Sequence, residues 1–374
     1  MSEPVAEAEG KRVSWAELFF DLVFVFAVTQ ISRFVHDDHS VLGSVQAFVV
    51  FLLVYWVWVG AAIQGNAFDM DQARRRLALF AIGLCGLVMA LSVTQAYDGR
   101  GLAFAVSYWV ARIVLVVGLV DRRAFSLRPY TVSAYVTGPL LVIGALVPSP
   151  ARLVVWSVAA ALDLAMPTLR RKALASLHFD AGHLTERFGL FVLIALGESV
   201  VAIGAPLATA DHLFAIDLIA VGVSFCFVVG LWWVYFHLAA DAMRYALATA
   251  SVQFTVTRHV LSYAHLAFVW AVILVAVGME ETVAHPLERL SAVIAVLLVG
   301  GCVLFLATFG YTRWMMFHLL SRTRLTAAGC AALVLPISLF VPALATLSLL
   351  TVILAALNLW ELRLTHLASR VVPR

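Results

Sequence analysis

The sequence ELFFDLVF, residues 17–24, places two carboxylates in an otherwise apolar stretch. Glu17 and Asp21 are four residues apart, so on a helix they share one face, about 6 Å apart along the axis. The apolar run continues to Gln30 with no further charge. The stretch therefore predicts an apolar helix with one acidic face, and that face needs partners from other parts of the chain.

The composition of the whole chain indicates an integral membrane protein. Of its 374 residues, 63% are hydrophobic and 13% are charged, whereas soluble domains carry roughly 25% charged residues. The apolar residues form many blocks of about 18 to 22 residues, long enough to cross a bilayer as helix. No period-2 alternation of polarity runs through the sequence, as it would in spanning strands. The predicted fold class is an all-α membrane protein.

The apolar blocks between charged residues predict about twelve transmembrane helices. The least certain division is the charge-free run from Leu325 to Trp360, which Pro336 and Pro342 divide into a hairpin. The predicted helices lie near 15–35, 45–64, 77–97, 101–120, 130–147, 152–169, 187–207, 214–237, 258–279, 289–310, 325–341 and 343–361.

The distribution of basic residues orients these helices. With a cytoplasmic N-terminus, 19 of the 25 Lys and Arg residues fall in inside segments. The outside loops hold only Arg33, Arg100, Arg152 and Arg289. Because cytoplasmic loops are enriched in Lys and Arg, this asymmetry predicts that both termini are cytoplasmic and that the number of spans is even.

Similar segments at corresponding places in the two halves predict an internal repeat. AELFFDLVFVFAVTQ at 16–30 aligns without gaps with TERFGLFVLIALGES at 185–199. Six helices per half make this a parallel repeat, an arrangement that often places a polar site between the halves near the bilayer midplane. Chance similarity between apolar segments is the alternative. The other paired features are YWVW at 55–58 with WWVY at 232–235, Pro139 with Pro336, Thr29 with Glu198, and Asp163 with Asn358.

The repeat divides the chain into five parts. We predict a disordered cytoplasmic tail at 1–12 and a first six-helix repeat at 13–169. A cytoplasmic linker at 170–185 joins it to a second six-helix repeat at 186–362. A cytoplasmic tail follows at 363–374.

The two carboxylates of the first helix have different interpretations. Ser14 and Glu17 have the spacing of a capping box, in which Glu17 bonds back to the Ser14 backbone, so capping and function are both open for Glu17. Asp21 lies one turn deeper, where capping does not account for it. It is either part of a structural polar network or a proton or ion site.

Three more ionisable residues lie deep within predicted spans. Glu198 is near the middle of its helix, and Arg112 is midway along another, so their matched depth predicts an ion pair between them. Asp163 lies in the inner third of its helix. Each ionised group at a helix centre costs about 3 kcal/mol and marks a proton, ion or substrate site. A structural ion pair and a hydrogen-bonded packing residue are the respective alternatives.

A further set of polar residues collects at the predicted cytoplasmic ends of the helices. His265 is about two turns into an apolar helix, too deep to be a cap, and is either a proton or ion site or a satisfied core histidine. The predicted cytoplasmic polar layer consists of Glu17, His183, Glu186, Arg187, His237, Asp241, Arg258 and His259.

These residues also carry a family resemblance. ELFFDLVFVFAVTQ, HLTERFGLFVLIALGES and RHVLSYAHLAFVWAVILVAVG resemble the signature segments of the bacterial low-temperature-requirement A family. The resemblance spans residues 12 to 365 and implies a multi-pass protein of the bacterial plasma (inner) membrane. The family name records a growth requirement, so the resemblance implies no substrate.

Three functions fit these features. The first is a proton- or ion-coupled secondary transporter of a small solute, based on the repeat and the charges within spans. The second is an intramembrane enzyme acting on a lipid or isoprenoid, in which the pairs of His183 with Glu186, His237 with Asp241, and His259 with His265 supply metal ligands. The third is a channel or scaffold without coupling chemistry.

No motif indicates a cofactor or a nucleic-acid partner. The expected partners are the lipid bilayer and a small-molecule or ion substrate. The sequence leaves open whether the chain forms a homo-oligomer.

Reporter fusions test the predicted topology. Fusions after Arg76 and Arg322 should report the cytoplasm, and a fusion after Arg100 should report the outside, because an even set of spans alternates in this way. A fusion after Arg123 should also report the cytoplasm, and an external signal from it would contradict the twelve-span arrangement.

Overall fold

The chain is built from helices that are long enough to cross a bilayer. The structure, a computed structural model, describes residues 11–70, 72–118, 129–208 and 210–371, and these residues contain helices and no strands. Ten of the described helices are long and apolar enough to cross a membrane, as judged by length and composition. The prediction of an all-α, multi-pass membrane protein is thus confirmed.

Two sets of helices follow one another along the chain. The first set comprises α1 (Trp15–Asp37), α2 (Val41–Ala67), α3 (Ala73–Ser92), η1 (Val93–Gln95), α4 (Gly101–Gly118), α5 (Pro129–Val132), η3 (Ser133–Thr137), α6 (Gly138–Ala145), α7 (Ala151–Leu169) and α8 (Arg171–Leu174). The second set comprises α9 (Ala181–Gly204), α10 (Ala215–Phe236), α11 (Ala239–Thr249), α12 (Gln253–Val256), η4 (Thr257–Ala264), α13 (His265–Ala284), α14 (Ala292–Phe317), α15 (Arg322–Ser338) and α16 (Ala343–Val371).

Each of the twelve predicted spans coincides with helix in the structure, but two of them are short. Residues 133–145 form a shorter apolar helix, and α15 has 17 residues. Both contain a proline, Pro139 and Pro336. The count of twelve spans therefore stays a prediction beside the ten helices of full length.

Some predicted boundaries differ from the structure. Helix α16 continues to Val371, so most of the predicted tail from residue 363 is helical. The predicted linker at 170–185 contains α8 and the first turn of α9. The predicted tail at 1–12 lies outside the described residues except for Lys11 and Arg12, and so do the basic loop residues Arg122, Arg123 and Arg128.

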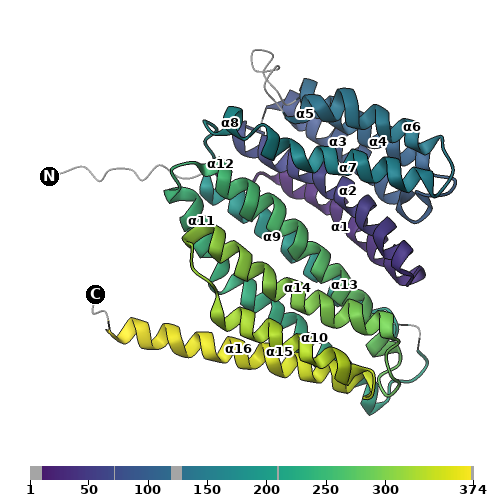
Figure 1. The fold of residues 1–374 in the computed structure, drawn as a ribbon, viewed down its shortest axis with the longest axis vertical. Coiled ribbons are helices and arrows are strands. Elements are labelled where there is room, and N and C mark those ends of the chain that lie inside the picture. The colour runs from purple at the N-terminus through teal and green to yellow at the C-terminus, as the bar shows by residue number, and fades with distance from the viewer. Residues whose placement is uncertain (1–10, 71, 119–128, 209, 372–374) are drawn as a thin grey trace.

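The same pattern of helix neighbours occurs in both sets. Helix α1 packs against α2 and α3, and α9 packs against α10 and α13. Helix α3 packs on α4, α4 on α6, and α6 on α7, while α13 packs on α14, α14 on α15, and α15 on α16. The two sets lie side by side, one from purple to teal and the other from green to yellow (Figure 1). Contacts of α1 with α9 and α13 join them.

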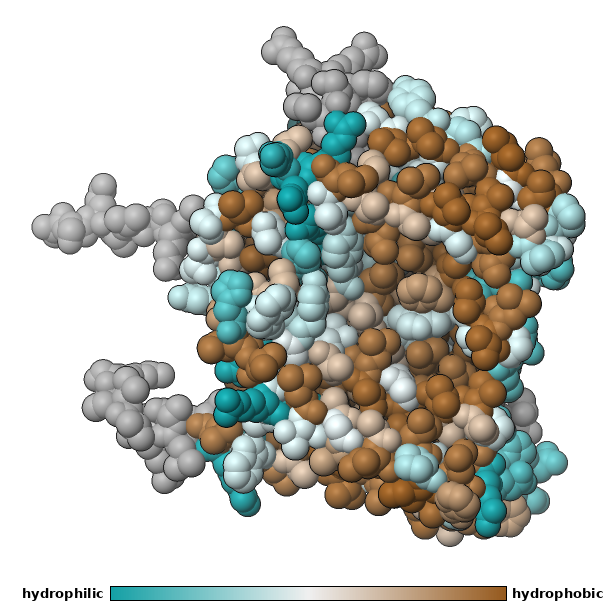
Figure 2. All heavy atoms as spheres, in the orientation of Figure 1, coloured by the Kyte–Doolittle hydropathy of each residue, from teal (hydrophilic) through white to brown (hydrophobic). Residues whose placement is uncertain are grey.

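The surface matches a membrane protein. A broad apolar area covers the face shown in Figure 2, with hydrophilic residues toward two opposite edges. The start of the described chain and the end of α16 lie at the same edge (Figure 1). Both ends at one edge require an even number of crossings.

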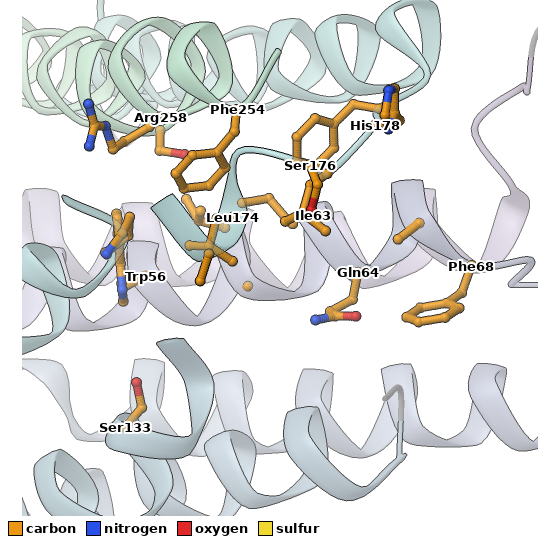
Figure 3. A pocket seen from close by; sticks show the side chains of 18 of the residues that line it. Trp56, Ile63, Gln64, Phe68, Ser133, Leu174, Ser176, His178, Phe254 and Arg258 are labelled. Atoms are coloured by element: carbon orange, nitrogen blue, oxygen red, sulfur yellow. The ribbon is translucent and has the colours of Figure 1, made fainter. Parts of the chain in front are cut away.

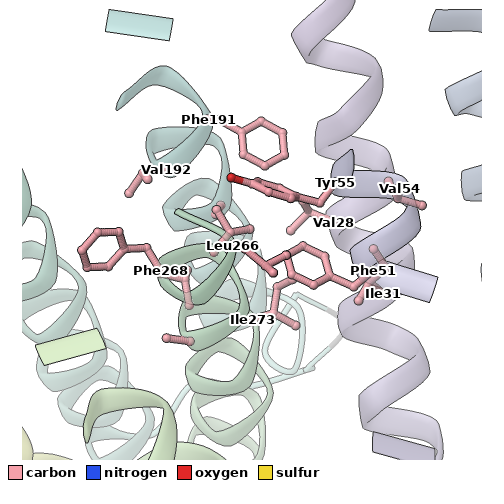
Figure 4. Close-up of a cluster of buried hydrophobic side chains, with 14 of the residues drawn as sticks. Val28, Ile31, Phe51, Val54, Tyr55, Phe191, Val192, Leu266, Phe268 and Ile273 are labelled. Carbon is pink, nitrogen blue, oxygen red and sulfur yellow. The ribbon is translucent and has the colours of Figure 1, made fainter. Parts of the chain in front are cut away.

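Aromatic and aliphatic side chains from both sets form one core. Figure 4 shows Val28 and Ile31 of α1 and Phe51 and Tyr55 of α2 facing residues of α9 and α13. The rings of Phe51 and Trp270 stack with centroids 5.4 Å apart. Helix α2 is the most enclosed of the spans, with 89% of its apolar window buried. Helix α2 is therefore buried between the two sets of helices.

Adjacent glycines of α14 provide a matched test of the packing. A Cβ on Gly301 would lie 2.8 Å from the carbonyl oxygen of Ala271, whereas the nearest atom to a Cβ on Gly300 is 4.0 Å away. We expect Gly301→Ala to destabilise the fold by about 1–3 kcal/mol through overpacking. Gly300→Ala should be neutral or stabilise by up to about 1 kcal/mol. Thermal unfolding in detergent measures both, and equal effects of the two variants would contradict the α13–α14 contact.

Candidate functional site

A buried ion network joins α1 to α9. The guanidinium of Arg187 donates through Nη1 to Glu17 Oε1 at 2.8 Å and through Nη2 to Asp21 Oδ1 at 3.0 Å. The side chains of Glu17 and Arg187 are fully buried, and that of Asp21 is 2% exposed. The prediction that Glu17 and Asp21 share a face is confirmed. We call Glu17, Asp21, His183 and Arg187, with Trp58 and Asn66, the Arg187 network.

Glu17 is both a cap and an ion-pair partner. Its Oε2 accepts from the backbone N–H and the hydroxyl of Ser14, each at 3.0 Å, and the Ser14 side chain accepts from the Glu17 N–H. The predicted capping box is thus confirmed. Nε2 of His183 lies 3.2 Å from the same Oε2. Both oxygens of Glu17 are therefore occupied by donors, as an ionised carboxylate requires.

Asp21 is held on one oxygen only. Its Oδ1 accepts from Trp58 Nε1 at 2.7 Å and from Arg187. Its Oδ2 is buried and has no partner among the described residues. The guanidinium of Arg187 also lies 5.6 Å from the ring centroid of Phe20 and 6.0 Å from that of Trp58. Aromatic faces therefore help to stabilise the buried cation.

At the start of α9, hydrogen bonds from Asn66 and Lys11 surround the end of the network that is nearest the edge of the bundle. Asn66 donates to the Asp180 carbonyl at 2.8 Å, and its Oδ1 accepts from the Asp180 N–H at 3.0 Å. Burial raises the pKa of Asp180, but the N–H groups of His183 and Lys11 that donate to its carboxylate bring the pKa below its ordinary value. Burial lowers the pKa of the Lys11 amine, which donates to carbonyls at the end of α2.

Gly65 on α2 is required by close approach to this network. A Cβ at this position would lie 2.3 Å from Glu17 Oε1 and 2.5 Å from Arg187 Nη1. Any larger side chain would push the ion pair apart. The network thus depends on α2 as well as on α1 and α9.

A second buried ion pair lies within the first set of helices. Arg112 donates to Asp163 Oδ2 at 3.2 Å, and Tyr108 donates to the same oxygen. Ser133 and Thr137 of the π-helical segment η3 donate to Oδ1 at 2.6 and 2.9 Å. The predicted pairing of Arg112 with Glu198 is therefore wrong. Two residues at the same depth on separate helices need not be in contact. Arg112 instead pairs with Asp163, which belongs to the same set of helices.

Glu198 instead meets α1. Its Oε2 accepts from the hydroxyl of Thr29 at 2.5 Å, and the residue is 6% exposed. Both Glu198 and Arg112 are described residues, and no ion pair joins them. Glu198 is therefore a buried carboxyl held by a neutral hydroxyl.

His265 lies in a separate polar pair. Its Nε2 is 2.6 Å from the Tyr235 hydroxyl, and its Nδ1 is 2.9 Å from the Val260 carbonyl, so the ring donates to the carbonyl and accepts from the tyrosine. The Phe188 ring packs on His265 at 5.1 Å and on Trp58 at 4.9 Å. An aromatic ring thus separates His265 from the Arg187 network.

The remaining members of the predicted polar layer do not converge. Glu186, His237 and Asp241 are exposed. His259 contacts Arg258 at 2.6 Å and the Tyr311 hydroxyl at 2.7 Å. Within the described ranges, no three His, Cys, Asp or Glu side chains are placed to hold one metal ion. The residues predicted as ligands do not fit a metal centre.

A cavity of about 290 Å³ lies between the two sets of helices. Figure 3 shows Phe254 and Arg258 on one side of it, with Trp56, Ile63 and Gln64 of α2 on another. Most of its lining is apolar, and the polar lining residues are Gln64, Ser133, Asp163, Ser176, His178, Arg258 and Ser262. The cavity thus has an apolar body with a few polar groups, as small-molecule sites have.

Helix α2 is shared by the cavity and the Arg187 network. Ile63, Gln64 and Phe68 line the cavity, while Gly65 and Asn66 contact the network. The π-helical segments η3 and η4 also line the cavity, through Ser133 and through Arg258 and Ser262. Such π-helical segments often occur at functional sites.

Sequence reasoning missed several residues of these sites. Trp58, Tyr108, Ser133 and Thr137 donate to buried carboxyl groups, and Asn66 bonds to the His183 ring, but the sequence does not predict any of them as a site residue. In the sequence, the polar residues Gln64 and Asn66 near the end of an apolar span are the one feature that could have indicated a polar site at this end of α2. For Ser133 and Thr137, only the three-dimensional structure identifies their partner.

Comparison with known proteins places the chain beside one bacterial family. The profile of the bacterial low temperature requirement A protein family matches residues 12–359. The chain is also 30% identical over 377 residues to "Uncharacterized protein RA0937" of Rhizobium meliloti (strain 1021), covering 95% of this chain and 90% of the relative. No solved structure matches the chain.

A double-mutant cycle tests the partner of Arg112. Arg112→Gln alone should cost about 3–5 kcal/mol, because it strands a buried carboxylate. Combining it with Asp163→Asn should recover part of that loss, with a coupling of about 0.5–3 kcal/mol. Combining it with Glu198→Gln should give additive losses. Unfolding in detergent measures each variant, and coupling to Glu198 in place of Asp163 would contradict the ion pair.

Proposed function

Since the chain belongs to the bacterial low temperature requirement A family and is a multi-pass membrane protein, we propose that it is a proton- or ion-coupled secondary transporter of a small solute. The solute occupies the cavity beside α2. The protein resides in the bacterial plasma membrane with both termini in the cytoplasm, in accordance with its basic loops.

The helix neighbours support a parallel six-plus-six repeat in this proposal. Helix α1 corresponds to α9, and the chain from α3 to α7 corresponds to the chain from α13 to α16, since the same neighbours pack in the same order. Thr29 and Glu198, which align in the repeat, hydrogen-bond to each other. Contact between equivalent positions is expected where two related bundles meet at a pseudo-symmetry axis. Transporters built this way bind solutes between their repeats.

The observation that carries the proposal is the position of the cavity. It lies between the two sets of helices and is bounded by α2, η3, α7, the segment after α8, and η4. Its lining favours a solute with a mainly apolar body and a few hydrogen-bonding groups. A movement of one set against the other would alter both the cavity and the Arg187 network, because both use α2.

Buried carboxyl groups support the coupling. Asp21 and Glu198 lie within membrane-spanning helices; Oδ2 of Asp21 is buried and has no partner among the described residues, and Oε2 of Glu198 accepts from the neutral hydroxyl of Thr29. Ionisable groups in such places characterise proton and ion pathways. Asp163 is different, because four donors satisfy its carboxylate. We therefore assign it a structural role beside the cavity.

Solute-dependent proton flux tests the proposal. Purified protein is reconstituted in liposomes that contain a pH-sensitive dye, and a panel of small, largely apolar solutes is added across a proton gradient. At least one solute class should accelerate the pH change. Ile63→Trp, which fills the cavity, should reduce that flux by about tenfold or more, a loss of at least about 1.4 kcal/mol of solute binding.

The matched control is Leu84→Trp on α3, since Leu84 is 63% exposed on the apolar surface. This variant should retain wild-type flux. Proton flux that no solute alters, or equal solute-dependent flux in Ile63→Trp and wild type, would contradict transport through the cavity.

A further inference from the structure

The hydrogen bonds around His183 define its protonation state. Asn66 Oδ1 faces the N–H of Asp180, and Asn66 Nδ2 faces the Asp180 carbonyl. A backbone N–H can only donate and a carbonyl can only accept, so the amide of Asn66 has one allowed orientation.

Asn66 Nδ2 therefore donates its other hydrogen to His183 Nδ1, 3.1 Å away. A proton on that Nδ1 would face an N–H group, so Nδ1 accepts. The ring of His183 is then neutral, with its hydrogen on Nε2 directed at Glu17 Oε2. His183 is a fixed neutral donor in this fold.

With His183 neutral, the charges of the network do not cancel. Glu17 and Asp21 are two carboxyl groups, and Arg187 is one cation. At the edge of the network, the Lys11 amine bonds to carbonyls at the end of α2 and the Asp180 carboxylate accepts from the His183 N–H, so these two residues add one positive and one negative charge and leave the difference unchanged. An uncompensated charge in so enclosed a place is strongly unfavourable.

The two carboxyl groups are distinguished by their donors. Glu17 accepts hydrogen bonds on both oxygens, as an ionised group does. Asp21 accepts two on Oδ1 and none on the buried Oδ2 among the described residues. The donors that an ionised carboxylate requires on both oxygens are thus present at Glu17 and absent at Oδ2 of Asp21, so Asp21 is the carboxyl group of the two that is better suited to be neutral.

In the part of the chain that the structure describes, the other titratable groups of α2, α3, α9 and α13 do not supply the missing positive charge to Asp21. From α2, Tyr55 faces the core and donates to the carbonyl of Ser262. From α13, His265 is bonded to Tyr235 and Val260 behind Phe188. From α3, the span carries Cys85, and its arginines are confined to the first turn. From α9, Glu186 is exposed and Glu198 is about three turns beyond Arg187.

We propose that Asp21 is a proton-binding site that is occupied in this conformation, with the proton on Oδ2, and that His183 is a positioning residue which stays neutral. Proton release from Asp21 requires a compensating change, because it leaves a second carboxylate beside one guanidinium. The protonation state stands on the fold alone, whether or not the protein transports a solute.

Matched variants of the two carboxyl groups test the assignment. Asp21→Asn imitates a neutral carboxyl and should change the melting temperature in detergent at pH 7 by no more than about 2 °C. Glu17→Gln removes an ionised partner of Arg187 and should lower it by on the order of 10 °C. Equal large losses in both variants would overturn the proposal, because Asp21 would then be ionised.

Infrared spectroscopy reads the proton directly and does not depend on variant stability. The wild-type protein at pH 7 should show a protonated carboxyl band that shifts in D₂O after exchange, and Asp21→Asn should lose that intensity while Glu17→Gln retains it. Absence of such a band in the wild type would overturn the proposal. So would ¹⁵N spectra of histidine-labelled protein, assigned with His183→Gln, that show a doubly protonated His183 ring at pH 7. These measurements need no solute, so their failure is distinguishable from a failure of transport.

Discussion

The fold depends on one buried guanidinium, that of Arg187, between carboxyl groups of another helix. A fully buried arginine remains charged, and it is stable only where carboxylate and aromatic partners replace water. The carboxylate of Glu17 and the rings of Phe20 and Trp58 fill these roles, and Oδ1 of Asp21 accepts a further hydrogen bond from the guanidinium. The same interaction ties α9 of the second set to α1 of the first, so it also fixes how the two sets meet.

Helix α2 links the Arg187 network to the cavity, because it contacts both. One side of its last turns contacts the Arg187 network at Gly65 and Asn66, and another lines the cavity at Ile63 and Gln64. Because protein interiors are close-packed, a displacement of α2 at the Arg187 network would also move the residues of α2 that line the cavity. This arrangement supplies a physical route by which the protonation of Asp21 and the occupancy of the cavity can influence each other. Such coupling requires that α2 have two arrangements, and that both the Arg187 network and the cavity favour one of them over the other.

Much of the fold follows from local sequence signals, while the partners of buried charges do not. Apolar blocks located the long helices but not the short α8 and α11, and the spacing of Ser14, Glu17 and Asp21 predicted the capping box and the shared acidic face. The partner of Arg112 was predicted wrongly, because depth alone does not distinguish Glu198 from Asp163. Ser133 and Thr137 hold Asp163 from a π-helical segment that hydropathy does not reveal. The cavity likewise arises from packing between distant segments.

The most direct test of the central interaction uses Arg187→Gln as a background, with unfolding of the purified protein as the measurement. Removing the guanidinium strands ionised Glu17, so Arg187→Gln should be strongly destabilised, by about 3–5 kcal/mol. Adding Glu17→Gln should restore much of that stability, and adding Asp21→Asn should restore little, because Asp21 is already neutral. A further loss on adding Glu17→Gln would contradict the account of a Glu17–Arg187 ion pair joining the two sets of helices, and recovery by Asp21→Asn would contradict a neutral Asp21.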